Sequence, residues 1–237
     1  MSTEEIIYPE LSAETIEGRA EQLLRDFREK TNRHELPVPV EVIAEQYLGY
    51  EIEILDDGLF SDPDYLGGII FDKNLIQVNA AVERHEGRYS FTLAHEIGHH
   101  VLHRDIYLKH KDVDTNGGMC RETGEKPVIE KQADRFAAAL LMPSAAVADV
   151  IDSIDDTVDT KSVTGMRMIA SRVIEQGNFT NVSNSAMVNR LIDLGYAPEA
   201  KYQTGTSHDF SRRIKSTPWW LWNSFWKLFQ RKRRRKK

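Results

Sequence analysis

Two histidines and a glutamate near the middle of the sequence have the spacing of a zinc site. His95 and His99 are four residues apart, and Glu96 directly follows His95. On a helix, residues four apart project from the same face. In this His-Glu-x-x-His pattern two imidazoles bind zinc and the glutamate acts as a general base. A helix over residues 90–103 would be largely buried, because its other residues include Phe91, Leu93, Ala94, Ile97, Val101 and Leu102. Histidines and a glutamate without partners are costly in such a helix.

A second predicted helix, over residues 128–142 and stopped by Pro143, offers a third ligand. Glu130 and Asp134 are also four apart and share a face. We expect Glu130 to ligate zinc and Asp134 to hold the outer nitrogen of a ligand histidine. The alternative is that both acids form the solvated face of an amphipathic helix. The upstream motif favours the ligand interpretation.

Other residues near the motif allow less definite interpretations. His99 and His103 are also four apart, but no glutamate follows His99, so this pair is disfavoured. His103 could be an oxyanion donor at the rim, although a surface histidine is the favoured interpretation. Tyr107 and Tyr65 are further possible oxyanion donors. Cys120 could cap the zinc, but a loop thiol without a role is favoured.

The elements that would position these residues predict an α+β fold, a small sheet followed by helices. Strands are expected at 50–55 and, as a hairpin, at 65–71 and 75–80. If the 75–80 strand is a sheet edge near the metal, it could align a substrate as an added strand. The expected helices are 12–31, 40–48, 90–103, 128–142, 164–176 and 183–194, the last two forming a helix–turn–helix-like unit after a linker at 144–160.

Length and charge bound the class of protein. The chain has 237 residues, 41% hydrophobic and 29% charged, near the average of globular proteins. Its single cysteine excludes an internal disulfide framework, and no signal peptide is visible. The net charge of −6 averages two unlike parts, because residues 211–237 hold 11 of the 31 basic residues and no acid. Residues 1–210 therefore carry 20 basic and 37 acidic groups, a net charge of −17. We expect three parts, a metallopeptidase domain at 1–150, the helical segment at 151–205 and a connector with a basic tail at 206–237.

The tail combines tryptophans with basic residues. On a helical wheel Trp219, Trp222 and Trp226 share one face, and a basic run that includes Arg231 and Arg233 follows. As a helix, the eleven residues 219–229 would be about 16 Å long, too short to span a bilayer. We expect an interfacial anchor on an anionic membrane surface. Single-stranded nucleic acid, an acidic partner, or no role are the alternatives.

The two helix motifs together, FTLAHEIGHHVLH and EKQADRFAAALLMP, resemble those of the ImmA/IrrE family of zinc metallopeptidases. The resemblance extends over about residues 15–145 and is absent over 200–237. It implies a gluzincin-like, zincin-type fold, with His95, His99 and Glu130 as Zn²⁺ ligands and Glu96 as catalytic base. It also implies a cytoplasmic endopeptidase that cleaves helix–turn–helix transcriptional repressors. With the tail, the protein could lie at the inner face of the membrane.

A different class of function is the main alternative. The chain could be a DNA-binding or scaffold regulator whose metal site is structural or vestigial. Segment 161–197 carries only four basic residues against two acids, a net charge of +2, next to acidic surroundings. Because DNA affinity depends on neutralising phosphates, direct DNA binding is disfavoured. We expect this segment to dock a protein substrate.

Overall fold

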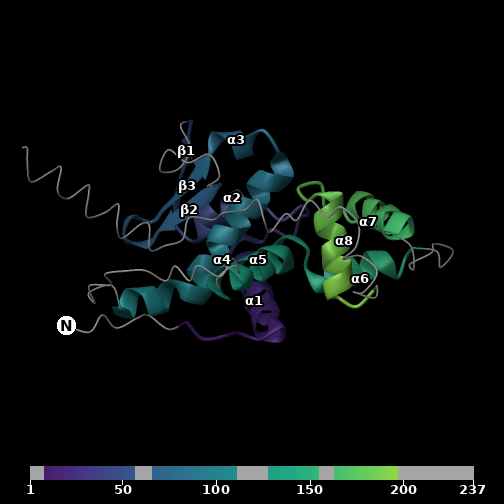
Figure 1. Ribbon diagram of the computed structural model, residues 1–237, viewed down its shortest axis with the longest axis horizontal. Coiled ribbons are helices and arrows are strands. Elements are labelled where there is room, and N and C mark those ends of the chain that lie inside the picture. Colours follow the sequence, from purple (N-terminus) through teal and green to yellow (C-terminus); the bar gives the residue numbers. More distant parts are fainter. Residues whose placement is uncertain (1–7, 57–65, 111–127, 155–162, 197–237) are drawn as a thin grey trace, which may run out of the picture.

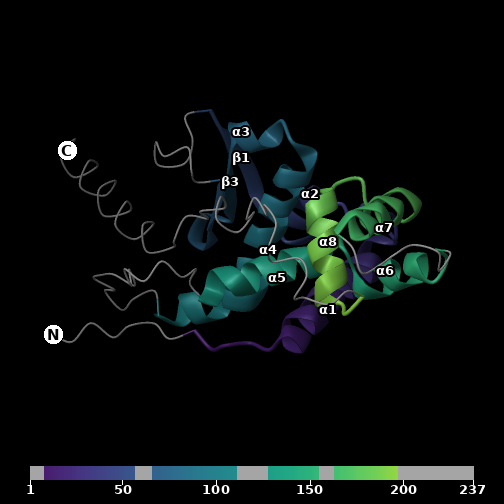
Figure 2. The same cartoon turned by 45° about the vertical axis from the view of Figure 1, so that its right-hand side comes forward.

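A three-stranded sheet and a group of helices enclose a shared core. The computed structural model describes residues 8–56, 66–110, 128–154 and 163–196. Helix α4 (Glu86–His110) lies between the sheet and helix α5 (Val128–Leu141), and helix α1 (Ala13–Thr31) packs on α5 away from the sheet (Figure 1). The turned view keeps helices α6 to α8 together at one end of α5 (Figure 2). The architecture is α+β, as the sequence predicts.

Helix α1 has the boundaries and the buried face that the sequence predicts. The Ser12 side chain accepts a hydrogen bond from the Thr15 backbone N–H and caps the first turn. Asn32, with φ of 54°, ends the helix in the left-handed conformation. The buried face consists of Ile16, Ala20, Leu23, Leu24 and Phe27.

The sheet joins strands β1 (Glu51–Leu55), β2 (Gly67–Ile70) and β3 (Leu75–Asn79) in the order β1-β3-β2. Strands β2 and β3 pair antiparallel across a 3-10 turn at Phe71–Lys73, which confirms the predicted hairpin. Strand β1 pairs parallel with β3. The substrate alignment considered for the 75–80 strand required a sheet edge, and the structure does not meet this condition. Strand β3 is central, and β2 is an edge strand of the described sheet.

Short helical segments connect α1, the sheet and α4. Helix α2 (Val40–Val42) continues into a π-helical turn at Ile43–Tyr47, and Gly49 follows with φ of 75°. The predicted helix over 40–48 is thus confirmed in place but is less regular than expected. Helix α3 (Ala80–Glu83) follows β3 directly, with the Asn79 side chain accepting a hydrogen bond from the Ala81 backbone N–H.

Helices α4 and α5 form the packing that carries both motifs. Helix α4 runs past the predicted end at residue 103, so residues 104–110 are helical rather than part of a polar loop. Helix α5 ends just before Pro143, as predicted. The two helices approach closely at Gly98, where an added Cβ would lie 3.2 Å from the Cα of Ala133 and from the Cδ1 of Phe136.

We expect Gly98→Ala to destabilise the fold by about 1–3 kcal/mol, because the new methyl group would push α5 away from α4. The matched control is Gly18→Ala in α1, where an added Cβ has no neighbour within 4 Å. That change should be neutral or stabilise the protein by up to about 1 kcal/mol, since alanine has the higher helix propensity. Urea denaturation of both variants measures the difference. Equal stabilities would contradict the close helix contact.

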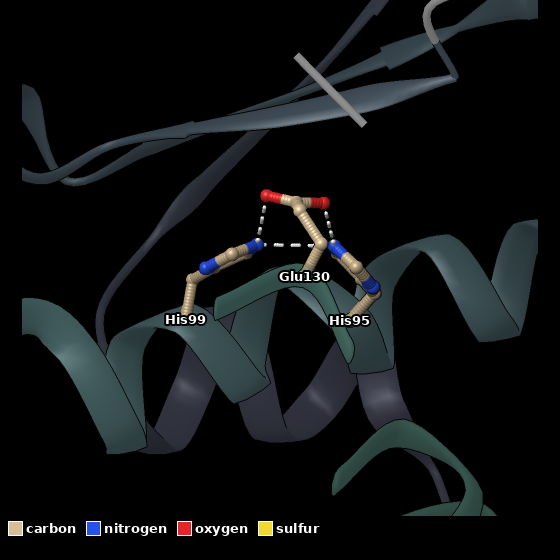
Figure 3. A group of neighbouring side chains, drawn as sticks. All are labelled: His95, His99 and Glu130. Carbon is tan, nitrogen blue, oxygen red and sulfur yellow. Dashed lines mark hydrogen bonds and ion pairs between the residues drawn. The ribbon is translucent and has the colours of Figure 1, made fainter. Parts of the chain in front are cut away.

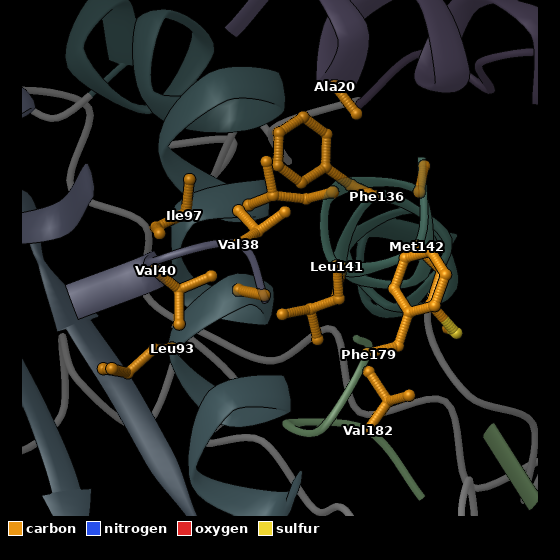
Figure 4. Close-up of a cluster of buried hydrophobic side chains, with 14 of the residues drawn as sticks. Ala20, Val38, Val40, Leu93, Ile97, Phe136, Leu141, Met142, Phe179 and Val182 are labelled. Carbon is orange, nitrogen blue, oxygen red and sulfur yellow. The ribbon is translucent and has the colours of Figure 1, made fainter. Parts of the chain in front are cut away.

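The last three helices of the described residues pack on the same hydrophobic core as the sheet and the earlier helices. Helix α6 (Ser144–Ile151) occupies the first half of the expected linker at 144–160, so this part is helical, while residues 155–160 lie outside the described residues. Helices α7 (Val163–Gln176) and α8 (Asn184–Asp193) lie where two helices are predicted, while their helix–turn–helix character and the three-domain division stay predictions. Phe179 and Val182 reach the same cluster as Leu93 of α4 and Leu141 of α5 (Figure 4). Among the described residues, no helix combines the length and apolar character needed to cross a membrane.

Candidate metal centre

Helices α4 and α5 bring His95, His99 and Glu130 together. The Nε2 atoms of the two histidines lie 3.0 Å apart. Glu130 Oε2 lies 3.3 Å from His95 Nε2, and Oε1 lies 3.4 Å from His99 Nε2. The carboxylate faces both imidazoles (Figure 3). Within the described residues, these three side chains form a group that could hold a metal ion.

The donor atoms suit a small divalent cation. In a tetrahedral zinc site with bonds of 2.0–2.1 Å, neighbouring ligand atoms are about 3.3 Å apart. The two histidine nitrogens are 3.0 Å apart, and each has a different oxygen of the Glu130 carboxylate at 3.3 or 3.4 Å, which is close to this value. In addition, the buried Glu130 Oε2 accepts no hydrogen bond of good geometry from the described residues. A buried carboxylate oxygen is costly without a partner, and a cation would provide one.

The outer nitrogen of His95 has a carboxylate partner. His95 Nδ1 lies 2.9 Å from Asp134 Oδ1, and Asp134 stands one turn after Glu130 on α5. The carboxylate can accept only a hydrogen bond, so Nδ1 carries a proton, and Nε2 is the nitrogen that faces Glu130 and His99. This is the contact that the sequence predicts for Asp134.

The electrostatics of the cluster attract positive charge. Burial lowers the pKa of His95, but its contacts with Asp134 and Glu130 outweigh burial and raise that pKa to about 10. Burial raises the pKa of Glu130, yet His99 and His95 outweigh this and hold it well below its usual value. A proton or a divalent cation can supply the positive charge that the cluster favours.

Glu96 lies beside the cluster in a narrow space between α4 and strand β2. Its side chain is buried, with 2% exposure, and burial raises its pKa while His95 and His99 partly offset the rise. An added Cβ at Gly67 of β2 would lie 3.2 Å from Glu96 Oε1 and only 2.4 Å from Thr92 Cγ2. Glycine at this position therefore lets β2 approach the glutamate.

A cleft opens over the cluster. Glu96, His99 and Glu130 lie in its wall, and the other described residues that line it are largely apolar or aromatic, namely Tyr8, Ile69, Ile70, Phe71, His103, Tyr107 and Ile129. Tyr107, a predicted oxyanion donor, packs against Phe71 with ring centroids 5.1 Å apart.

His103 is not the surface residue that the sequence favours. It is 3% exposed, and both of its ring nitrogens are engaged, Nδ1 with His99 and Nε2 with Gln132. Neither nitrogen is therefore available to an oxyanion in this arrangement. Tyr65, Cys120 and the tail residues Trp219, Trp222, Trp226, Arg231 and Arg233 lie outside the described residues.

Sequence reasoning missed two contributors to this region. Gln132 is buried and bonds to both His103 and the Pro9 carbonyl. Tyr8 lines the cleft and meets the His103 ring edge-on, with centroids 5.6 Å apart. Residues 8–9 fall in no predicted element, so no periodicity could connect them to the site.

We expect Asp134→Asn to weaken zinc binding by about 10- to 100-fold, the usual effect of losing a partner that orients a ligand. Asparagine could present its NH₂ group to Nδ1 and favour the wrong tautomer. Competition with a chromogenic chelator measures the affinity. The control is Asp149→Asn, which removes an equal charge from an exposed position on α6. An Asp134→Asn affinity equal to that of the control would contradict the role of Asp134.

The fold and this site define an α+β protein with a candidate metal centre, and comparisons with known proteins define its family. Residues 55–191 match the Peptidase_M78 family model, described as an IrrE N-terminal-like domain. Since the match covers more than half of the chain, the chain belongs to this family. The radiation response metalloprotease IrrE of Deinococcus radiodurans is 36% identical over 101 residues, which are 43% of this chain and 26% of that protein. The chain thus matches about a quarter of that relative's length.

Proposed function

We propose that the chain is a zinc-dependent endopeptidase. The observation that carries this proposal is the convergence of His95, His99 and Glu130 at ligand spacing next to the buried Glu96. The family and its metalloprotease relative support a protease role. In this proposal the three converging side chains hold Zn²⁺ and Glu96 does not ligate it.

The residues of the site divide the work of peptide hydrolysis. When bound, Zn²⁺ would supply Lewis-acid activation of water and of the scissile carbonyl. Glu96 would accept a proton from the attacking water and then donate it to the leaving amine. Asp134 would keep the proton of His95 on Nδ1. Burial raises the pKa of Glu96, which moves it toward the range suited to proton transfer near neutral pH.

Strand β2, rather than β3, would align the substrate. It is an edge strand of the described sheet, and its Ile69 and Ile70 line the cleft beside Glu96. An extended peptide could add to this edge and place its scissile bond next to the cluster. The apolar lining favours an apolar substrate side chain next to the cleaved bond.

The proposed substrate is a helix–turn–helix repressor or a similar regulatory protein. This proposal rests on the family resemblance and on the acidic body of the chain. Residues 1–210 carry a net charge of −17, which suits a protein substrate better than DNA. We place the activity in the cytoplasm, with the basic tail at the inner membrane face as the sequence predicts.

One of the four basic residues of segment 161–197, Arg190, is buried and is therefore not available for DNA binding. Arg190 of α8 is 3% exposed and bonds to both Glu17 carboxylate oxygens and to the Met142 carbonyl. It therefore ties α8 to α1 and to the end of α5 and has little surface to offer phosphate. The remaining positive charge of this segment is small, which supports docking of protein rather than DNA.

Zinc should stabilise the protein if the site binds it. At a free zinc concentration of 100 times Kd, mass action predicts about 2.7 kcal/mol of added stability. Thermal melts with zinc, and with a chelator, measure this shift. A melting temperature that does not respond to zinc would contradict a zinc site of useful affinity.

Cleavage tests the function itself. The purified chain is incubated with purified helix–turn–helix repressors, and mass spectrometry identifies new termini. We expect one or a few cuts that a chelator abolishes and added zinc restores. Cutting that persists in the chelator would overturn the metal proposal, and no cutting would overturn this choice of substrate.

A further inference from the structure

A chain of buried hydrogen bonds connects His99 to the N-terminal segment. His99 Nδ1 lies 3.0 Å from His103 Nδ1, and His103 Nε2 lies 2.9 Å from Gln132 Oε1. Gln132 Nε2 then donates to the backbone carbonyl of Pro9 at 2.9 Å. His99, His103 and Gln132 have exposures of only 9%, 3% and 4%. Bulk water therefore has little access to these groups.

The donor and acceptor of each of these hydrogen bonds follow from the Pro9 carbonyl, where the series ends. The Pro9 carbonyl can only accept, so the Gln132 amide must direct its NH₂ group toward Pro9 and its oxygen toward His103. That oxygen accepts, so His103 Nε2 carries the proton. In a neutral imidazole the other nitrogen is an acceptor, and His103 Nδ1 therefore accepts from His99 Nδ1–H.

The surroundings of His103 favour the neutral ring that this direction requires. His103 is 3% exposed and its hydrogen-bond partner Gln132 is uncharged, so a positive charge on this buried ring would be costly. The edge-on contact with Tyr8 encloses the ring further. A cationic His103 would direct an N–H at the Nδ1–H of His99 and would break the chain of hydrogen bonds.

We propose that His103 and Gln132 are positioning residues that fix the tautomer of His99, with the Pro9 carbonyl setting the direction of the chain. This inference rests on the proposed zinc-binding function. His99 Nε2 is left as a lone pair that faces His95 Nε2 and Glu130. Asp134 does the same for His95, so a carboxylate orients one ligand and a neutral imidazole orients the other. The N-terminal segment thereby becomes part of the metal centre.

The test reads the tautomers and the zinc affinity of the full chain. Long-range ¹H–¹⁵N spectra of histidine-labelled protein should show His103 protonated at Nε2, with and without zinc. Gln132→Met keeps the volume but removes the acceptor and should weaken zinc binding by about 10- to 100-fold. Gln132→Glu keeps an acceptor for His103 Nε2, but it loses the N–H that the Pro9 carbonyl accepts and its negative charge favours a cationic ring, so it should not restore the affinity.

A control and two contrary outcomes complete the test. Tyr50→Phe removes a similar hydrogen bond, the one between Tyr50 and the neighbouring His100 on α4, and should leave zinc affinity unchanged. His103 protonated at Nδ1 in the wild-type spectra would overturn the inference, whether or not the variants fold. Wild-type zinc affinity in Gln132→Met would also overturn it. A wild-type chain that binds no zinc would instead overturn the proposed function.

Discussion

Glu96→Gln should abolish peptide cleavage while leaving zinc bound. General acid–base catalysis contributes about 10²- to 10⁴-fold, and the glutamine amide can neither accept the proton from water nor donate it to the amine. The zinc ligands are untouched, because Glu96 contributes no atom to the group formed by His95, His99 and Glu130. Initial cleavage rates and zinc content, measured on the same preparation, give both results.

The matched control for this variant is Glu86→Gln. Glu86 lies in the first turn of the same helix, and its side chain is exposed. This control should cleave at the wild-type rate. Full activity of Glu96→Gln would remove Glu96 from the mechanism. Loss of zinc from Glu96→Gln would instead assign it to the metal.

Glu130→Gln should lose zinc and activity together. The change removes the one negative charge among the three proposed ligands, and the neutral amide is a poor partner for the cation. We expect zinc affinity to fall by more than about 10²-fold, beyond the upper end of effects from residues that only orient ligands. Chelator competition measures the affinity, and cleavage at saturating zinc measures what remains.

The zinc affinities of the three variants, compared with one another, distinguish a ligand from residues that only support the ligands. Glu130→Gln should bind zinc more weakly than Asp134→Asn, which in turn should bind it more weakly than Glu96→Gln. Zinc affinity of Glu130→Gln equal to that of wild type would show that another group completes the site.

The grouping of His95, His99 and Glu130 could be predicted from the sequence because the two motifs are local. Four-residue spacing within α4 and within α5 determines which side chains share a face, and both helices formed with that spacing. The helix pairing followed from their apolar faces. The contact of Asp134 with a ligand histidine could therefore be predicted from the motifs, and the structure shows that this histidine is His95.

The order of the strands in the sheet depends on contacts between residues that are far apart in sequence. A turn between two apolar runs predicts that β2 and β3 pair, but it does not say on which side β1 joins them. The parallel pairing of β1 with β3 depends on packing of the whole sheet. Because β3 is central, the proposed substrate contact lies at β2 instead.

His103 and Gln132 were missed for a related reason. The burial of His103 depends on Tyr8 and on the start of α5, which are far from it in sequence. Helical spacing places Gln132 about 200° around α5 from Glu130, so periodicity gave no signal for it. Its long side chain nevertheless reaches His103 and Pro9. Only the packed structure brings these groups together.

A zinc-edge anomalous difference map from crystals of the zinc-loaded chain tests the central claim most directly. We predict one strong peak within about 2.0–2.2 Å of His95 Nε2, His99 Nε2 and a Glu130 oxygen. Glu96 should lie beside the peak without bonding to it. A map without density between these three side chains, or with zinc held by other residues, would contradict the account.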